Sequence, residues 1–406
     1  MKYNVRKWNP LLIGIPDIGI GVMWGALGNV IAFMAYHFTD KATDIAKIYM
    51  LAAVVGVITQ IFVGYLSDRT KHKWGKRSPW LFYGMVLSGV SVFLWPFAGS
   101  FTVYLILVTL TCILVNIAQC AYYTMVMEVV DHDQVGAANT IARTTSTVGS
   151  LLMGVVAGFL WSNQHPSVSF ICMGLIMIIA TVVIVPTVVK ERPENYISHQ
   201  KQTFSLEFLT NVEALKVFAI TFLYFAASTG IVQMGTSLFV KTYGVQEHVV
   251  GRFSIFGTIV SLAFGVLAFG FIDKIDKKWM FVISTIGLIC DFIFLKINLH
   301  VGIAPHTLYI WTTLYGLFFL IGNIAMYSVL PIVAPKGKLG WYMGLLNFAI
   351  ALPQFIMSDV YGHLIDSGKA NMIMPLIISF YVIGLIIALT LKLRKKEAKN
   401  FAEAQR

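Results

Sequence analysis

The chain has 406 residues, 57% of them hydrophobic and only 12% charged, with a mean hydropathy of +0.76. A soluble domain carries about 25% charged residues, so this composition excludes an ordinary soluble protein and predicts a protein embedded in a lipid bilayer. The net charge of +11 would suit a nucleic-acid partner, but the positions of the basic residues argue against one.

Long apolar runs follow one another along the whole sequence. A membrane-spanning helix needs about 20 mostly apolar residues. The first run shows no small-residue cleavage site, so we expect an uncleaved first span rather than a signal peptide. The runs predict twelve spanning helices, at approximately residues 10–36, 45–66, 79–98, 102–127, 140–161, 168–189, 215–240, 250–272, 279–297, 306–333, 341–365 and 371–391.

The four cysteines all lie inside these predicted spans and form no CxxC motif. We interpret them as small apolar residues of the helix bundle rather than as disulfides or metal ligands. The sequence therefore predicts neither a metal site nor a cofactor.

Most of the 30 Lys and Arg residues lie in the N-terminal segment, in the loops after every second span and in the C-terminal tail. Cytoplasmic loops of membrane proteins are enriched in Lys and Arg. We therefore expect a multi-pass protein of the cell membrane with both termini in the cytoplasm. The positive charge is then an orientation signal, and no nucleic-acid partner is expected.

The longest polar interval, residues 190–214, divides the twelve spans six and six. We expect an N-terminal six-helix bundle (1–189), a cytoplasmic linker (190–214), a C-terminal six-helix bundle (215–393) and a cytoplasmic tail (394–406). An internal repeat supports this division, because SDRTKHKW (67–74) aligns with FIDKIDKKW (271–279), and AYYT (121–124) aligns with AMYS (325–328). Transporters are often built from such repeats. The predicted fold class is all-α and integral to the membrane, with two six-helix bundles.

The loop between the second and third predicted spans carries a dense charge pattern, GYLSDRTKHKWGKRSPW (64–80). Its form resembles the signature of the major facilitator superfamily at this position. The longer string TQIFVGYLSDRTKHKWGKRSPW is similar to the glycoside–pentoside–hexuronide transporters and to the sucrose/proton symporters of the solute carrier 45 type. The resemblance implies a sugar carrier with twelve spans. It also implies a monomer, since members of this family are usually monomeric.

Charges at the ends of spans two and four predict a gate on the cytoplasmic side. A small residue at position 64 allows two helices to approach closely. A carboxylate at position 68 can face the positive N-terminus of a neighbouring helix. The resemblance implies that this neighbouring helix is span eleven. The basic residues of the loop can reach the acids after span four. The predicted gate comprises Gly64, Asp68, Arg69, Gly75, Arg77, Glu128 and Asp131. The alternative is a basic loop that only sets topology.

Amides and aromatic residues on several spans predict a sugar site, since sugars need hydrogen-bonding groups and aromatic faces. The resemblance places spans 1, 4, 7 and 10 around a central cavity. Asn116, Gln119 and Tyr123 share a helix face in span four, and the repeat pairs Gln119 with Asn323 and Tyr123 with Tyr327. The candidate set is Trp24, Asn29, Asn116, Gln119, Tyr123, Gln233, Trp311, Asn323, Tyr327 and Gln354, with Gln60 beside it. The alternative for each is a hydrogen bond between helices.

Acidic residues inside spans are costly and are candidates for ion coupling. Asp359 and His363 lie four residues apart on span eleven, which suits a proton relay, and Asp17 lies near the start of span one. Asp291 lies on span nine, which the superfamily places at the periphery, so we expect it to be structural. The run VVGVITQIFVG (54–64) has no carboxylate, unlike the melibiose-type members. This difference favours protons over sodium as the coupling ion.

We interpret the chain as a secondary active transporter that moves a disaccharide or glycoside by alternating access, with proton symport. A sugar uniporter and an exporter of amphiphilic compounds on the same fold remain alternatives, as does a sensor that binds without transport. The sequence has no HExxH, GxSxG or Walker pattern, and its nine His residues are scattered. We therefore do not expect an enzyme.

Overall fold

The computed structural model describes residues 9–129, 135–191, 206–268, 275–335 and 339–393. Every regular element within these ranges is helical. The apolar composition explains this result, because a helix satisfies all its backbone hydrogen bonds within one segment when no water is present.

The described residues of the first part of the chain form eight α-helices. A three-residue 3₁₀ turn, Trp95–Phe97, follows α4, and a π-helical turn, Val156–Leu160, continues α6. The α-helices are α1 (Asn9–Leu27), α2 (Val30–Ala35), α3 (Ala42–Asp68), α4 (Ser78–Phe93), α5 (Phe101–Val129), α6 (Val135–Val155), α7 (Ser167–Val182) and α8 (Ile184–Thr187).

The second part begins with a 3₁₀ turn, Leu206–Thr210, and contains six α-helices. A π-helical segment, Ser237–Thr242, follows α9, and a 3₁₀ turn, Ala370–Met372, precedes α14. The α-helices are α9 (Val212–Val232), α10 (Glu247–Ala268), α11 (Lys277–Asn298), α12 (Pro305–Val333), α13 (Leu339–Asp366) and α14 (Ile373–Leu389).

Each of the twelve predicted spans coincides with one helix or with a broken helix. Nine helices of the described ranges are long and apolar enough to cross a bilayer, and α1 is a shorter apolar helix. The first span is interrupted at Gly28 and Asn29, where α1 ends and α2 begins. The structure thus confirms an all-α membrane fold.

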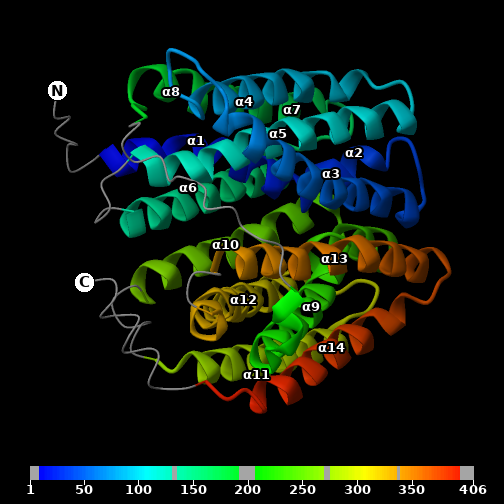
Figure 1. Ribbon diagram of the computed structural model, residues 1–406. Helices are drawn as coiled ribbons and strands as arrows, with labels where there is room; N and C mark the ends of the chain where they lie inside the picture. Colours follow the sequence, from blue (N-terminus) through cyan, green and yellow to red (C-terminus); the bar gives the residue numbers. More distant parts are fainter. Residues whose placement is uncertain (1–8, 130–134, 192–205, 269–274, 336–338, 394–406) are drawn as a thin grey trace.

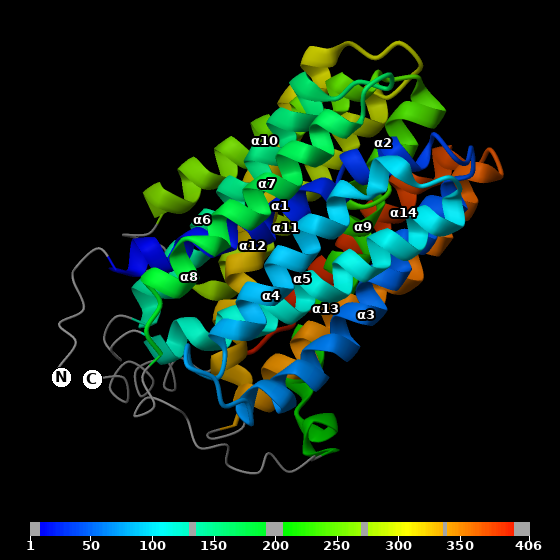
Figure 2. The same cartoon turned by 90° about the horizontal axis from the view of Figure 1, so that it is seen from above.

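The helices form two bundles that lie side by side (Figure 1). Helices α1 to α8 pack against one another, and α9 to α14 pack against one another. Contacts between the bundles are made chiefly by α3 with α13 and by α6 with α10. Seen from above, the long helices of both bundles run in the same general direction (Figure 2), as expected for helices that cross one membrane.

Glycines bring α1 and α6 into close contact. A Cβ at Gly21 would collide with the backbone of Ser146, and one at Gly25 would lie 2.8 Å from the Cα of Ser150. Small residues at helix contacts let backbones approach in a membrane. This contact fixes the cavity-facing end of α1 against α6.

Candidate functional site

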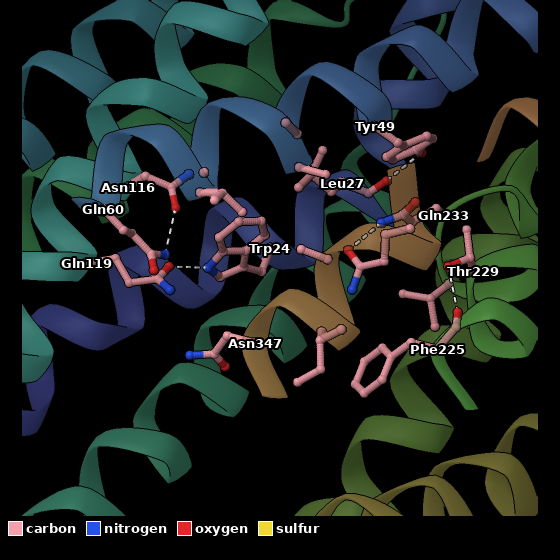
Figure 3. Close-up of a pocket in the computed structure, with 18 of the residues that line it drawn as sticks. Trp24, Leu27, Tyr49, Gln60, Asn116, Gln119, Phe225, Thr229, Gln233 and Asn347 are labelled. Atoms are coloured by element: carbon pink, nitrogen blue, oxygen red, sulfur yellow. Dashed lines mark hydrogen bonds between the residues drawn. The ribbon is translucent and has the colours of Figure 1, made fainter. Parts of the chain in front are cut away.

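A cavity of about 570 Å³ lies between the two bundles. Helices α1, α3, α5 and α6 form one side, and α9, α12 and α13 form the other (Figure 3). This volume falls within the range of ordinary small-molecule sites, which is about 300–1,000 Å³. The cavity therefore has the size for a ligand such as a sugar.

The wall from the first bundle carries two pairs of hydrogen-bonded side chains. The indole N–H of Trp24 donates to Oε1 of Gln119 across 2.8 Å, and Nε2 of Gln60 donates to Oδ1 of Asn116 across 3.2 Å. Asn116 in turn donates to the carbonyl of Cys112, 2.8 Å away. These bonds hold the amides of α5 in fixed orientations at the cavity surface (Figure 3).

The wall from the second bundle carries a matching amide pair. Nε2 of Gln233, just after α9, donates to Oε1 of Gln354 on α13 across 2.9 Å. The hydroxyl of Ser358 donates to Oε1 of Gln233 across 2.6 Å. Figure 3 shows Gln233 across the cavity from Trp24 and Gln119. Both bundles therefore present oriented amides, each with hydrogen-bonding capacity left for a ligand.

The helix break in the first span lies at one end of the cavity. Tyr49 donates its hydroxyl proton to the carbonyl of Leu27 across 2.6 Å, and Thr236 of the other bundle donates to the carbonyl of Gly28 across 2.8 Å. Because α1 stops at Leu27, these carbonyls have lost their helical partners, and the two hydroxyls replace them. The break thus joins the two bundles at this end.

Two tyrosines and one arginine lie near each other on the remaining part of the wall. Tyr123 of α5, Tyr327 of α12 and Arg143 of α6 all line the cavity. Nη1 of Arg143 donates to the hydroxyl of Tyr123 across 3.2 Å, and the guanidinium lies 4.4 Å from the centre of that ring. The sequence predicts both tyrosines but not the arginine.

Three predicted cavity residues lie elsewhere. Trp311 is fully buried inside the second bundle, against the rings of Phe239 and Phe292. Asn29 is buried at the helix break, where its side chain accepts from the N–H of Val30. Asn323 donates to the carbonyl of Phe319 in its own helix and is not among the cavity-lining residues. Of the four residues that the repeat pairs, Gln119, Tyr123 and Tyr327 therefore line the cavity, and Asn323 does not.

The predicted ion-coupling residues occupy two different environments. Asp17 is fully buried in α1, and neither carboxylate oxygen has a hydrogen-bond partner among the described residues. Arg143 lies close enough for its charge to act on Asp17. Asp359 and His363 instead form an exposed pair, 3.4 Å apart, outside the cavity lining. Asp359 and His363 thus lie next to each other on α13, as their spacing predicts, but they do not lie at the ligand cavity.

A buried charge cluster lies at the loop between α3 and α4. Arg77, only 2% exposed, donates to Asp68 and to Ser67, and its Nε lies 3.4 Å from Oε2 of Glu128. Lys76 lies 3.3 Å from Oε1 of Glu128. The predicted contact between Arg77 and Glu128 is therefore present, and it ties α3, α4 and α5 together.

Glu191 completes this cluster and was not anticipated from the sequence. Its carboxylate accepts from the backbone N–H groups of Lys76, Arg77 and Ser78 at 2.6–2.8 Å. It therefore caps the N-terminus of α4, where a negative charge is stabilised. Gly75 adopts a φ of +111°, and a Cβ there would collide with the Glu191 carboxylate. Gly75 is thus needed both for its backbone conformation and for space.

The remaining predicted gate residues behave differently. Arg69 is exposed and lies over the ring of Tyr65, 3.7 Å from its centre, rather than at the acids of α5. A Cβ at Gly64 would have no heavy atom within 4 Å, so the close helix contact expected there is absent from this conformation. Asp131 lies outside the described residues.

Hydrogen bonds between the bundles gather at the end of the molecule where α3 begins and α13 ends. The carboxylate of Asp366 accepts from the N–H groups of Ala42 and Thr43 at 2.8 and 2.9 Å. Lys241 pairs with Asp366 across 2.7 Å and also donates to the carbonyl of Asp40. These contacts join the two bundles at this end.

Two further contacts between the bundles involve Trp161 and Arg252. The indole of Trp161 donates to Oε2 of Glu247 across 2.8 Å, and Nε of Arg252 donates to the carbonyl of Gly158 across 3.1 Å. They link the π-helical turn after α6 to the start of α10. None of these cross-bundle partners could be paired from the sequence, because each pair is more than 80 residues apart.

The fold agrees with a comparison of the chain with known families. The sequence profile of the Major Facilitator Superfamily matches residues 18–358. The chain belongs to the Major Facilitator Superfamily. As a member of that superfamily it is a multi-pass membrane transporter rather than an enzyme.

Three curated relatives of this superfamily protein share short similar segments with it. The inner membrane symporter YicJ of Escherichia coli (strain K12) is 30% identical over 66 residues, which are 15% of this chain and 14% of YicJ. The putative glycoside/cation symporter YagG of the same strain is 27% identical over 121 residues, 27% of this chain and 26% of YagG. An uncharacterized symporter of Synechocystis, sll1374, is 28% identical over 81 residues, 19% of this chain and 14% of that protein. The matches thus span 14–26% of these relatives' length.

Solved structures of two transporters have the same fold. The xylose transporter XylE from E. coli, in an inward open conformation, has a TM-score of 0.73 and 15% identity, with 95% of this chain and 96% of XylE covered. The nucleoside transporter NupG has a TM-score of 0.71 and 12% identity, with 94% of this chain and 99% of NupG covered. At these identities the likeness shows the shared fold over nearly the whole chain.

Proposed function

We propose that this Major Facilitator Superfamily member carries a sugar or glycoside across the cell membrane by alternating access. The observation that supports this most is the cavity itself, which presents oriented amides from both bundles and the indole of Trp24. Amides match the hydroxyls of a sugar, and an aromatic face matches the apolar face of its ring. The names of the relatives, which include a glycoside/cation symporter, agree with this class of substrate.

Two rigid parts would move about this cavity. We assign residues 1–189 and 215–393 to the two moving bundles, residues 190–214 to a cytoplasmic linker and 394–406 to a cytoplasmic tail. Both termini would then face the cytoplasm, and Asp366, Lys241 and Ala42 would lie on the outer side. With these contacts formed, this conformation would be the state closed to the outside. The transporter needs no second copy, because both walls of the cavity come from one chain.

The cluster around Arg77 would act as the inner gate. In this conformation its described ion pairs join α3, α4 and α5 within one bundle. In the state open to the outside, Asp68 would turn to the N-terminus of α13, where a carboxylate is stabilised by the helix dipole. A few charge-assisted contacts supply the few kcal/mol that a two-state switch requires.

Proton symport is the proposed energy source, with Asp17 as the group that carries the proton. A buried carboxylate without a hydrogen-bond partner is costly in a membrane helix and is a candidate for a functional residue. Asp291 shares this feature, but Asp17 alone of the two has a cavity-lining charge, Arg143, within range. Arg143 connects Asp17 to the cavity, since its charge acts on Asp17 and its side chain lines the cavity. Asp359 and His363 lie outside the cavity lining and are weaker candidates for coupling.

The test is uptake of labelled sucrose, maltose, trehalose and melibiose into proteoliposomes with an inward proton gradient, a sodium gradient or neither. We expect accumulation driven by the proton gradient, and we expect Asp17→Asn to equilibrate the same sugar without accumulating it. Equilibration without accumulation by the unaltered protein would indicate a uniporter. Absence of flux for every sugar and glycoside tried would contradict the proposal and favour an exporter of amphiphilic compounds.

A further inference from the structure

Four residues with buried polar atoms lie inside the second bundle, away from the ligand cavity. They are Asp291 of α11, Trp311 and Tyr315 of α12 and Tyr381 of α14, and none of them lines the cavity. Both carboxylate oxygens of Asp291, the indole N–H and the two tyrosine hydroxyls are shielded from solvent and have no hydrogen-bond partner among the described residues. Such groups are rare in native proteins and call for an explanation.

Helix packing brings these side chains to one level of the bundle. Helix α11 packs against both α12 and α14. All four residues lie about two to three turns from the ends that these helices have on one side of the bundle. The ring centre of Phe292, the neighbour of Asp291 in the chain, lies 5.9 Å from that of Tyr315 and 5.7 Å from that of Tyr381. The charge of Asp291 acts on both tyrosines.

An unpaired carboxylate is costly at the position of Asp291. Its side chain is only 3% exposed, and no described Lys, Arg or His pairs with it. Buried charges in proteins are paired or coordinate metal ions, and acids inside membrane helices usually have a partner. A proton on Asp291 would remove the charge but would leave the hydroxyls of Tyr315 and Tyr381 without partners. A bound cation would satisfy all three side chains.

We propose that Asp291, Tyr315 and Tyr381 bind a monovalent alkali-metal cation inside the second bundle. Carboxylate and hydroxyl oxygens are the ligands that hard cations prefer. One carboxylate balances a single positive charge, and the described residues contain no group of three His, Cys, Asp or Glu side chains that could hold a metal ion of higher charge. Aromatic ring faces, such as that of Phe292, also attract cations. A water bound to the ion would accept the hydrogen bond that Trp311 can donate.

The position of this ion gives it a structural role rather than a role in the ligand cavity. Helices α11, α12 and α14 would each supply one ligand, so the ion would join three helices of one bundle. The structural role that the sequence predicts for Asp291 then has a physical basis. The inference goes beyond the proposed function and does not depend on which ligand the cavity takes.

The experiment measures ion binding directly on the purified protein in detergent. The protein is dialysed against N-methylglucamine chloride, and the binding of radioactive sodium and of radioactive rubidium, a potassium analogue, is followed by scintillation proximity. We expect saturable binding of one ion per chain for at least one of the two. The same ion should raise the melting temperature at constant ionic strength, since a ligand that binds only the folded state stabilises it.

Variants of the three proposed ligands locate the ion. Asp291→Asn keeps the shape of the side chain but removes the charge, and it should weaken ion binding at least about 100-fold. Tyr315→Phe and Tyr381→Phe each remove one oxygen and should weaken it about 3- to 10-fold. Tyr104→Phe is the matched control, because the hydroxyl of this buried tyrosine of the first bundle bonds the carbonyl of Ile31 across 2.9 Å. It should leave the ion affinity unchanged.

Two results would overturn the proposal. Absence of saturable binding of both ions would indicate that Asp291 carries a proton instead. Ion binding that survives in Asp291→Asn but is lost in Asp17→Asn would place the ion in the first bundle. If Asp291→Asn does not accumulate, the tyrosine variants decide the question. A reduced affinity in both Tyr315→Phe and Tyr381→Phe supports the site, and an unchanged affinity in either contradicts it.

Discussion

The carboxylate of Asp366, the last residue of α13, accepts a hydrogen bond from the N–H of Ala42, the first residue of α3, across 2.8 Å. The two residues belong to different bundles and lie 324 positions apart. A helix N-terminus attracts a negative charge because its first N–H groups have no helical partner. Asp366 therefore holds the bundles together at one end of the cavity.

Replacing Asp366 with Asn should weaken this closure. The variant loses the charged cap of α3 and the ion pair with Lys241, which should destabilise the closed state by about 1–2 kcal/mol relative to the open state. The fraction of molecules that are open at this end should then rise about 5- to 30-fold. The measurement is alkylation of Cys120, which lines the cavity, by an impermeant maleimide added from the outer side. Cys172 and Cys290 would be replaced with serine beforehand.

Asp44→Asn is the matched control for Asp366→Asn. Asp44 also lies in the first turn of α3, but it bonds Thr39 and Lys47 of its own bundle. The Asp44→Asn variant should leave the labelling of Cys120 from the outer side unchanged. If both variants, or neither, increase the labelling, then Asp366 is not the residue that closes this end.

Removing Arg77 should destabilise the protein strongly. Asp68 would lose its nearest cationic partner and the buried Glu128 one of its cationic partners, and breaking a buried ion pair by removing one partner costs about 3–5 kcal/mol. We expect Arg77→Gln to lower the melting temperature measured by size-exclusion chromatography after heating. Arg69→Gln, which removes an exposed charge from the same loop, should shift it little. Equal shifts in the two variants would contradict the structural role of Arg77.

Asp68→Asn tests the proposed inner gate. The neutral side chain keeps the shape but loses the charge that would be stabilised at the N-terminus of α13. We expect uptake to be lost while ligand binding in detergent and the amount of protein in the membrane are retained. Full uptake by this variant would show that the Asp68 charge is not required for the gate.

Substitution of the two tryptophans of the candidate set should affect ligand affinity differently. Trp24→Ala removes an indole that lines the cavity and orients Gln119, so ligand affinity should fall about 10-fold or more. Trp311→Phe changes a ring that is buried inside the second bundle, so the dissociation constant should stay the same. Calorimetric titration of both variants is the measurement. A large loss of affinity in Trp311→Phe alone would place the site elsewhere.

Glycine substitutions distinguish packing from gating. A Cβ at Gly21 meets the backbone of Ser146, which cannot yield easily, so Gly21→Ala should destabilise the protein by several kcal/mol or prevent its accumulation. Gly64→Ala meets open space in this conformation and should keep its thermal stability. A marked destabilisation by Gly64→Ala would mean that this glycine is already packed against a neighbour.

The fold was predictable because each span is an apolar run of about the bilayer thickness. The amides of α5 were also predictable, since Asn116, Gln119 and Tyr123 lie three to seven residues apart and so share a face. The repeat did not guarantee the same role for Asn323, whose amide bonds its own helix. Local spacing thus fixes which residues share a face but not what that face contacts.

Other features of the site depend on contacts between distant segments. The sequence predicts span five from about residue 140, but α6 begins at Val135 and so carries Arg143 two turns into the helix, where it reaches the cavity. Trp311 could face the cavity or the bundle interior, and only the packing of Phe239 and Phe292 decides this. A cationic residue inside a spanning helix was the signal in the sequence that would have identified Arg143.

Solute counterflow is the measurement that tests most directly whether the cavity carries a sugar by alternating access. Proteoliposomes are loaded with an unlabelled glycoside that binds, then diluted into a trace of the same labelled glycoside without any ion gradient. The account predicts a transient accumulation of label above the equilibrium level, abolished by Asp68→Asn and preserved in Asp44→Asn. Entry of label without an overshoot, or an overshoot that survives in Asp68→Asn, would contradict it.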